Sequence, residues 1–270
     1  QRELRLGHMN YPRLRYLEMP VTATPADSAR AARMMADEAV AAIVVLGGDG
    51  TSRVVVGACG AVPVAGVSTG TNNAFPELRE PTITGMAVGL AATGQVPAAQ
   101  ALRQNKWLEV MLNDRREIAL VDVAVVEDRF VGARAIWKTT GFRDLFVTFG
   151  LPQAIGMSSI AGLCDPVDRD TPEGRHIRLS PDAPRHLLAP IAPGLIDRVG
   201  IAGTARMLAG SLHQPSIPAG SLAFDGEREL TFSDKDRVAV RLVPDAFRTV
   251  DVPACMAHAA RHGLFIRNPD

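Results

Sequence analysis

The sequence predicts a parallel α/β domain over residues 1–104, followed by a mostly antiparallel β domain over residues 105–270. In the first part, apolar and β-branched runs alternate with helix-like stretches and end in glycine-rich segments, which is typical of a parallel sheet. In the second part, short alternating segments are separated by turn residues, which is typical of antiparallel sheet. A chain of 270 residues that is 47% apolar is also large enough to bury sizeable cores.

The first part supplies its elements in order. A short strand is predicted at 15–19, and the segment 24–27 carries start signals for a helix over 28–39. The continuous apolar run 41–46 favours a strand buried on both faces. The remaining elements are a helix over 52–59, a second buried strand over 62–67 and a helix over 82–96.

The second part changes to β texture near residue 105. The stretch 153–162 is predicted to be helical, and the proline-rich stretch 181–193 is predicted to be a loop. The predicted strands cover residues 107–112, 117–126, 221–224, 229–232 and 238–243.

Charge and cysteine content exclude several classes of protein. There are 29 basic and 29 acidic residues, and this balance disfavours nucleic acid and anionic membranes as partners. The longest apolar run, 39–46, is too short to span a membrane, and three widely spaced cysteines do not suit a disulfide framework. We therefore expect a cytoplasmic protein.

The segment LGGDGTSR, 46–53, is the strongest local motif. Its glycines directly follow a predicted buried strand, so backbone amides at the start of the next helix can approach phosphate oxygens closely. Asp49 would repel phosphate, and its presence therefore indicates metal coordination, a bond to a ligand hydroxyl, or proton acceptance. The alternative is an ordinary Asp49-Gly50 turn in which Thr51 caps the next helix.

A second polar loop, STGTNNAFP at 68–76, follows the next predicted strand. Successive parallel strands are usually neighbours, so both loops should line the same edge of the sheet and form one crevice. The alternative is a surface loop rich in asparagine. Hydroxyls and amides for a nucleotide are offered by Ser68, Thr69, Thr71, Asn72 and Asn73.

A third motif, FDGE at 224–227, lies in the β domain. Two carboxylates around a glycine can form a simple hairpin turn. Functionally, Asp225 is a candidate base for an acceptor hydroxyl, and Glu227 is a candidate metal ligand.

These three motifs, in this order and spacing, resemble those of the NAD kinase and diacylglycerol kinase-like superfamily, most closely its acetoin catabolism protein X branch. The resemblance covers most of the chain and implies the NAD kinase-like fold, a Rossmann-like parallel α/β domain followed by a β-sandwich domain. It implies a first strand with an Asn-Pro motif that is missing here, and a C-terminal tail that packs back on the first domain.

The resemblance also implies roles for individual residues. Asp49 would contact the substrate hydroxyl or its metal-bound phosphates, and Asp225 would act as the base. Where NAD kinases have an Asn-Glu pair, the nearest match here is Val121-Asp122, so Asp122 is the candidate for that part of the nucleotide site. Phosphate would be held by Gly47, Gly48, Gly50 and Thr51, and the pocket would be completed by Thr69, Gly70, Thr71 and Asn72.

Two functions follow from this resemblance. One is an ATP- and Mg²⁺-dependent kinase that transfers phosphoryl to a hydroxyl of NAD or another metabolite. The other is a nucleotide-binding accessory protein of acetoin catabolism that lacks this chemistry. A homo-oligomer is expected in both cases. All three lysines follow residue 104, so the first domain has no P-loop lysine and would bind phosphate through backbone amides, a metal or arginine.

Two further sites compete with the nucleotide site. The segment 66–70 matches the G-x-S-x-G elbow of hydrolases, which requires a helix immediately after Ser68. Cys255, His258 and His262 would share one helical face and could offer three ligands to zinc.

Overall fold

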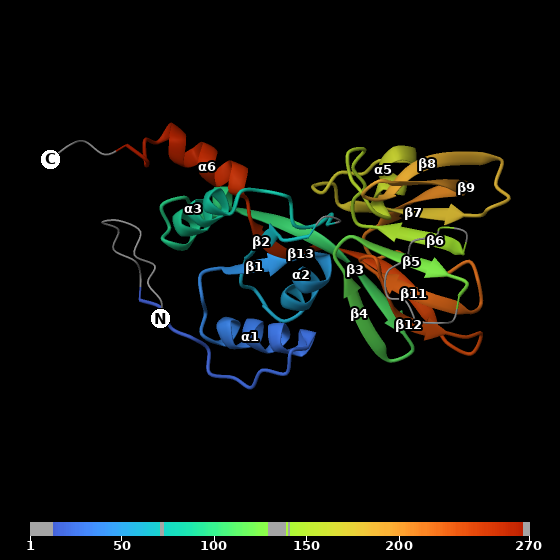
Figure 1. Cartoon of the computed structure of the whole chain (residues 1–270), viewed down its shortest axis with the longest axis horizontal. Coiled ribbons are helices and arrows are strands. Elements are labelled where there is room, and N and C mark those ends of the chain that lie inside the picture. Colours follow the sequence, from blue (N-terminus) through green and yellow to red (C-terminus); the bar gives the residue numbers. More distant parts are fainter. Residues whose placement is uncertain (1–12, 71–72, 129–138, 140, 267–270) are drawn as a thin grey trace.

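A mixed sheet forms the first layer of the computed structural model, which describes residues 13–70, 73–128, 139 and 141–266 (Figure 1). Its strands are β1 (Ile43–Gly47), β2 (Val64–Ser68), β3 (Leu102–Leu112), β4 (Arg115–Ala119), β10 (Leu212–His213) and β13 (Val238–Val250). They follow the order β1-β2-β13-β3-β4, and β10 pairs with β13. β1 and β2 are parallel and β13 is parallel to β2, whereas β3 is antiparallel to both β13 and β4.

Helices cover both faces of this sheet (Figure 1). On one face, α1 (Pro25–Asp37) and α2 (Asp49–Val56) bury Ala32 and Val55 against Ile43 of β1. On the other face, α3 (Pro81–Ala92), α4 (Ala98–Ala101) and α6 (Val252–Arg261) bury Ala87 and Cys255 against the sheet. The C-terminal helix α6 therefore packs with the helices of the first part of the chain.

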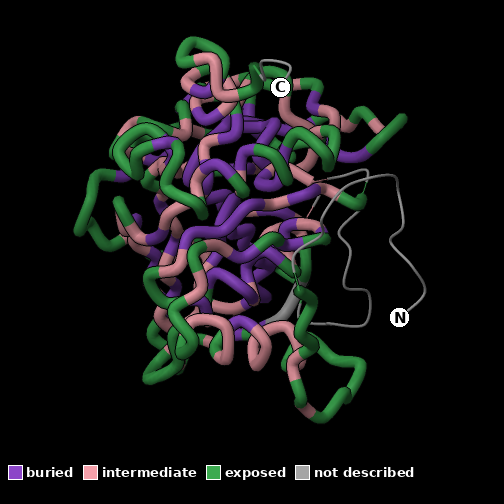
Figure 2. The backbone as a smooth tube through the Cα atoms, turned by 90° about the vertical axis from the view of Figure 1, so that its left-hand side faces the viewer, coloured by how far each residue is buried: buried purple, intermediate pink, exposed green. Residues whose placement is uncertain are grey.

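An antiparallel sheet forms the second layer, in the order β12-β11-β5-β6-β7-β9-β8. Its strands are β5 (Asp122–Val126), β6 (Phe142–Val147), β7 (Glu173–Leu179), β8 (Arg185–Ala192), β9 (Leu195–Leu208), β11 (Gly220–Phe224) and β12 (Glu227–Phe232). One face packs against β3 and β13 through a core that includes Leu108, Leu242 and Phe146. The other face is covered by α5 (Ser158–Cys164), which buries Ile160. Figure 2 shows the buried segments concentrated in the interior.

The predicted fold class, an α/β layer followed by a β-sandwich, is confirmed by this arrangement. The division into domains at residue 105 stays a prediction. β3 and β13 are hydrogen-bonded into the first sheet. They also pack against the second sheet and so form one layer of the sandwich. No helix in the described ranges has the length and apolar character that a membrane crossing requires.

Several expected elements differ from the structure. Residues 15–19 form no strand, and the stretch 117–126 divides into β4 and β5, which lie in different sheets. β1 is buried on one face only, because it is the edge strand and its second face leaves Leu46 69% exposed. The expected loop 181–193 contains β8, which accepts proline because it is also an edge strand.

Candidate nucleotide site

The two glycine-rich strand exits meet at one edge of the first sheet, as the sequence predicts. β1 and β2 pair in register, with Gly47 opposite Ser68. The amide of Thr69 donates to the carbonyl of Gly47 at 3.4 Å. The backbone beyond both strands therefore runs side by side.

Asp49 joins the two loops. Its carboxylate accepts the amide of Ala74 at 2.9 Å and the amide of Phe75 at 2.8 Å, one on each oxygen. Burial raises the pKa of Asp49, whereas the two amides and the positive charge of Arg169 oppose this rise. The side chain therefore holds the second loop against the start of α2.

Two glycines allow this close approach. A Cβ on Gly47 would lie 2.7 Å from Cβ of Thr51, and a Cβ on Gly48 would lie 2.5 Å from Oδ1 of Asn73. Asn73 in turn donates from Nδ2 to Oγ of Ser68 at 2.8 Å. A larger residue at position 47 would displace Thr51 of α2, and one at position 48 would displace Asn73 of the second loop.

The N-terminus of α2 opens onto a large cleft. Gly48 is the N-cap residue and no side chain caps this helix end, while Thr51 in its first turn is exposed. Uncapped amides and the helix dipole attract anions. The cleft has a volume of about 850 Å³, and its polar lining comes mainly from α1, α2 and β4 and includes Gly50, Thr51, Arg33, Arg53, Arg115 and Glu227.

Asp225 lies in the turn between β11 and β12, where it has a φ of 49°. Its side chain is fully buried and accepts the amides of Leu120 at 3.2 Å, Val121 at 2.8 Å and Asp122 at 3.2 Å. Arg53 of α2 approaches the same carboxylate to 3.5 Å. Burial raises the pKa of Asp225 to about 7, although Arg53 favours the ionised form. In this conformation the carboxylate joins α2 to the second sheet and does not face the cleft.

Asp122 at the start of β5 is the third buried carboxylate of this region. Its Oδ1 is buried and has no hydrogen-bond partner. Burial raises its pKa well above the ordinary value of 3.8, and the negative charges of Asp225 and Asp49 add to the rise. The buried environment of Asp122 therefore favours its neutral form over its ionised form.

We expect the substitution Asp122→Asn to stabilise the protein at pH 8 by more than it does at pH 4, near the ordinary pKa of the unfolded carboxyl. Because the folded pKa is raised, the wild type loses stability as pH rises from about 4 through the folded pKa. Asparagine is neutral throughout, so we expect it to gain about 1–3 kcal/mol at pH 8. Urea unfolding at both pH values measures this gain. Asp114→Asn, at an exposed turn, is the control, and equal gains at both pH values would contradict the expectation.

Glu227 is the exposed carboxylate of the site. It begins β12, and its Oε1 would lie 4.0 Å from a Cβ added to Gly50. Of the loop residues predicted for the pocket, Thr69 and Gly70 are exposed, and Asn73 lies between the two loops. Thr71 and Asn72 lie outside the described residues.

Arg169 is a residue of this region that sequence reasoning missed. It comes from the loop before β7 and donates to the carbonyls of Ala74 and Phe75. Its guanidinium lies 4.0 Å from the ring centroid of Phe149. No local pattern distinguishes it, because it is one of 26 arginines and lies more than 90 residues beyond the loop that it contacts.

The two competing sites are not assembled. No helix follows Ser68 directly, since α3 begins at Pro81, so the hydrolase elbow is absent. Cys255 is buried and its Sγ faces the carbonyl of Ala101 at 3.7 Å. In the described part of the chain, no group of three or more His, Cys, Asp or Glu side chains is arranged to hold a metal.

Comparisons with known proteins agree with the motifs. The family model of the acetoin catabolism protein X C-terminal domain matches residues 106–245, and that of the ATP-NAD kinase N-terminal domain matches residues 5–95. A crystal structure of yeast NADH kinase complexed with NADH aligns with a TM-score of 0.45 and 15% identity, over 85% of this chain and 67% of that chain.

One curated relative is similar in sequence over most of the chain. Acetoin catabolism protein X of Cupriavidus necator is 54% identical over 260 residues, which cover 94% of this chain and 72% of that protein. The C-terminal family model itself matches about half of the chain. The chain belongs to the acetoin catabolism protein X family, with an ATP-NAD kinase type of N-terminal domain.

Proposed function

We propose that this protein binds ATP in the cleft at the start of α2 and transfers its γ-phosphoryl group to a hydroxyl of a small metabolite, NAD being one candidate. The observation that carries the proposal is the uncapped N-terminus of α2, where Gly50 and Thr51 line a cleft of about 850 Å³ and Asp49 binds the second glycine-rich loop. That volume is in the range of nucleotide-sized ligand sites.

The phosphate side of the proposed site relies on the backbone. In the proposal, Gly47, Gly48, Gly50 and Thr51 present amides and a hydroxyl to the phosphates. Arg53 and Arg33 line the same cleft and supply positive charge. The proposed nucleotide pocket also includes Thr69, Gly70, Thr71, Asn72 and Asn73. Asp122 is buried, so in the proposal it supports the pocket without contacting the nucleotide.

The side chains around the cleft offer few ligands for Mg²⁺. Asp49 and Asp225 already accept backbone amides, so Glu227 is the carboxylate that remains exposed among the three proposed acids. Magnesium commonly binds through one or two carboxylates, substrate phosphates and water. Glu227 would therefore hold the ion together with the nucleotide, and the ion would neutralise charge on the phosphates.

Phosphoryl transfer in the proposed reaction forms a bond from the acceptor oxygen to the γ-phosphorus and breaks the bond from that phosphorus to the oxygen that leaves with ADP, while the hydroxyl proton passes to solvent water. A loose transition state makes positioning and charge neutralisation more important than a strong base. Asp225 has a pKa suited to proton acceptance, but its carboxylate is turned away from the cleft in this conformation. We therefore assign Asp49 and Asp225 a positioning role here, and the base role of Asp225 stays a prediction.

A nucleotide-binding accessory protein without transfer activity is the second candidate. The observation that favours it is that both predicted catalytic acids, Asp49 and Asp225, are buried and occupied by backbone amides. Both candidates predict ATP binding, and only the kinase predicts a phosphorylated acceptor. The homo-oligomeric state and the cytoplasmic location stay predictions under either candidate.

Glu227→Gln is expected to raise the Mg²⁺ concentration needed for half-maximal ATP binding about tenfold, because one charged ligand is lost. Thermal stability should stay within about 1 kcal/mol, since the side chain is exposed. Calorimetric titration of ATP at several Mg²⁺ concentrations measures the shift, with Glu18→Gln, at an exposed position outside the site, as the control. An unchanged Mg²⁺ dependence would remove Glu227 from the metal site.

The deciding experiment is a phosphoryl-transfer assay with ATP, Mg²⁺ and a panel of acceptors that includes NAD and hydroxylated metabolites. A phosphorylated acceptor, with the reaction lost in Asp49→Asn, supports the kinase. ATP binding without any phosphorylated acceptor favours the accessory role. If neither ATP nor NAD binds or raises the melting temperature, both candidates are wrong.

A further inference from the structure

The backbone of the second loop is held from two sides at Ala74 and Phe75. Asp49, on α2, accepts the two amide hydrogens of these residues. Arg169, from the loop before β7, donates to their two carbonyl oxygens, to Phe75 at 3.1 Å and to Ala74. Asp49 lies on the helix that follows β1 of the first sheet, whereas Arg169 lies just before β7 of the second sheet.

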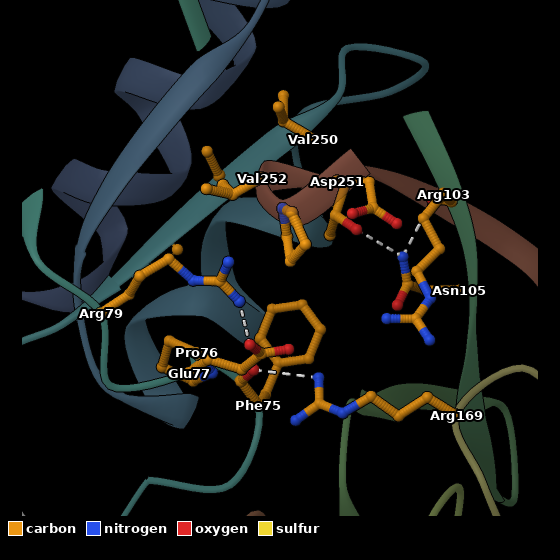
Figure 3. A pocket seen from close by; sticks show the side chains of 14 residues that line it. Phe75, Pro76, Glu77, Arg79, Arg103, Asn105, Arg169, Val250, Asp251 and Val252 are labelled. Atoms are coloured by element: carbon orange, nitrogen blue, oxygen red, sulfur yellow. Dashed lines mark hydrogen bonds and ion pairs between the residues drawn. The ribbon is translucent and has the colours of Figure 1, made fainter. Parts of the chain in front are cut away.

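Arg169 is fixed in place by its surroundings. Its guanidinium stacks on Phe149 at 4.0 Å and lies 5.8 Å from the ring centroid of Phe75. Figure 3 shows its guanidinium directed at Phe75 across a small cavity, with Glu77 and Arg79 on the same wall as Phe75. A planar guanidinium that stacks and donates two hydrogen bonds has little freedom to reorient.

Lys106 holds the loop that carries Arg169. It lies on β3 and is buried, and its Nζ donates to the carbonyls of Asp168 at 2.9 Å, Thr171 at 2.6 Å and Glu173 at 2.6 Å. These three acceptors lie on both sides of Arg169 in the chain. All three ammonium hydrogens are therefore used, and burial lowers the pKa of Lys106 to about 8.

The contact between Arg169 and the second loop connects the proposed nucleotide site to the second sheet. Residues 68–70 and 73–76 lie beside the start of α2, and the backbone path of 73–76 decides where Asn73 lies against Gly48. Asp49 binds the backbone amides of Ala74 and Phe75. Without Arg169, the carbonyls of the same two residues would lose their donors. The position of the loop therefore depends on residues more than 90 positions later in the sequence.

We propose that Arg169, held by Lys106, is the positioning residue that sets the second loop for nucleotide binding. The proposal rests on the proposed function for its consequence, because the loop is part of the ATP site only if that function is right. Lys106 acts through Arg169 and touches neither loop of the site. Neither residue is assigned a contact with the nucleotide.

The test is a double-mutant cycle on ATP affinity, measured by titration in the presence of Mg²⁺. Arg169→Ala removes two charge-assisted hydrogen bonds and is expected to raise the Kd about tenfold to a hundredfold. Arg169→Lys keeps the charge but cannot reach both carbonyls in the same way, so an intermediate increase is expected. Lys106→Met should raise the Kd in the same direction.

The decisive result is the double variant. If Lys106 acts through Arg169, Lys106→Met adds little to the Kd once Arg169 is alanine, so the two effects are not additive. Lys235→Met, at an exposed turn, is the matched control and should leave the Kd unchanged. Fully additive effects would overturn the role of Lys106, and an unchanged Kd in Arg169→Ala would overturn the whole proposal.

Hydrogen exchange separates this proposal from the proposed function. The amides of Ala74 and Phe75 should exchange at least about tenfold faster in Arg169→Ala than in the wild type, whether or not ATP binds. If wild-type protein binds no ATP but this exchange still accelerates, the proposed function fails and the positioning of the loop stands. If exchange is unchanged in Arg169→Ala and Arg169→Lys, the positioning itself is wrong. Exchange also remains readable in Arg169→Lys if Arg169→Ala does not fold.

Discussion

Replacing Asp225 by alanine is expected to cost about 3–5 kcal/mol of folding free energy, enough to unfold much of the protein at physiological temperature. The carboxylate accepts three consecutive backbone amides, those of Leu120, Val121 and Asp122. It also faces the guanidinium of Arg53, whose side chain is only 10% exposed. Alanine leaves the three amides without their acceptor and removes the carboxylate that faces Arg53, and desolvated donors carry the full penalty.

Urea unfolding of Asp225→Ala against wild type at pH 7.5 measures this loss. Asp236→Ala is a matched control, because Asp236 also accepts a backbone amide in a turn, that of Ser233 at 2.9 Å, but in a solvent-accessible position. We expect the control to lose no more than about 1 kcal/mol. A loss in Asp225→Ala no larger than that in the control would contradict the buried joint between α2 and the second sheet.

The second large effect is expected for Asp49→Ala, with ATP binding weakened about a hundredfold or more. Two charge-assisted hydrogen bonds to Ala74 and Phe75 are lost, each worth about 1.5–3 kcal/mol. The second loop then separates from the start of α2, and the proposed phosphate site opens. Asp49→Asn should also weaken binding, because its NH₂ group would face one of the two amide donors.

ATP titration and melting temperature, measured together, separate binding from folding in the Asp49 variants. Asp37→Ala, at the exposed end of α1, serves as the control and should change neither quantity. If Asp49→Ala binds ATP as tightly as the wild type at a temperature where both are folded, the loops do not form the nucleotide site. That result would contradict the proposed function directly.

The meeting of the two glycine-rich loops could be predicted because it depends on local order along the chain. Consecutive parallel strands pair as neighbours, and their carboxyl ends then lie at the same edge. β1 and β2 do this in register, and Gly47 and Gly48 are glycine because Thr51 and Asn73 occupy the adjoining space. The FDGE motif is a candidate for the site because of its two carboxylates and the family resemblance, and neither predicts that Asp225 accepts three backbone amides.

Elements whose state depends on distant partners could not be predicted in this way. β8 contains Pro190 and can be a strand because it lies at the edge of the second sheet, where a missing amide hydrogen costs little. β1 has an apolar sequence throughout, yet its second face is exposed because its position at the edge of the sheet, and not its composition, decides burial.

The family, the alternation of strands and helices, and the composition of the two glycine-rich loops can be read from the sequence, since each depends on residues close together in the chain. The tertiary structure was needed to show that Asp49 and Asp225 accept backbone amides, that Asp122 is buried, that Arg169 binds the second loop and that Lys106 binds the segment around Arg169. The physical reason is that a charged side chain takes its role from burial and from hydrogen-bond partners. Those partners come from segments up to about 100 residues away, which no local pattern specifies.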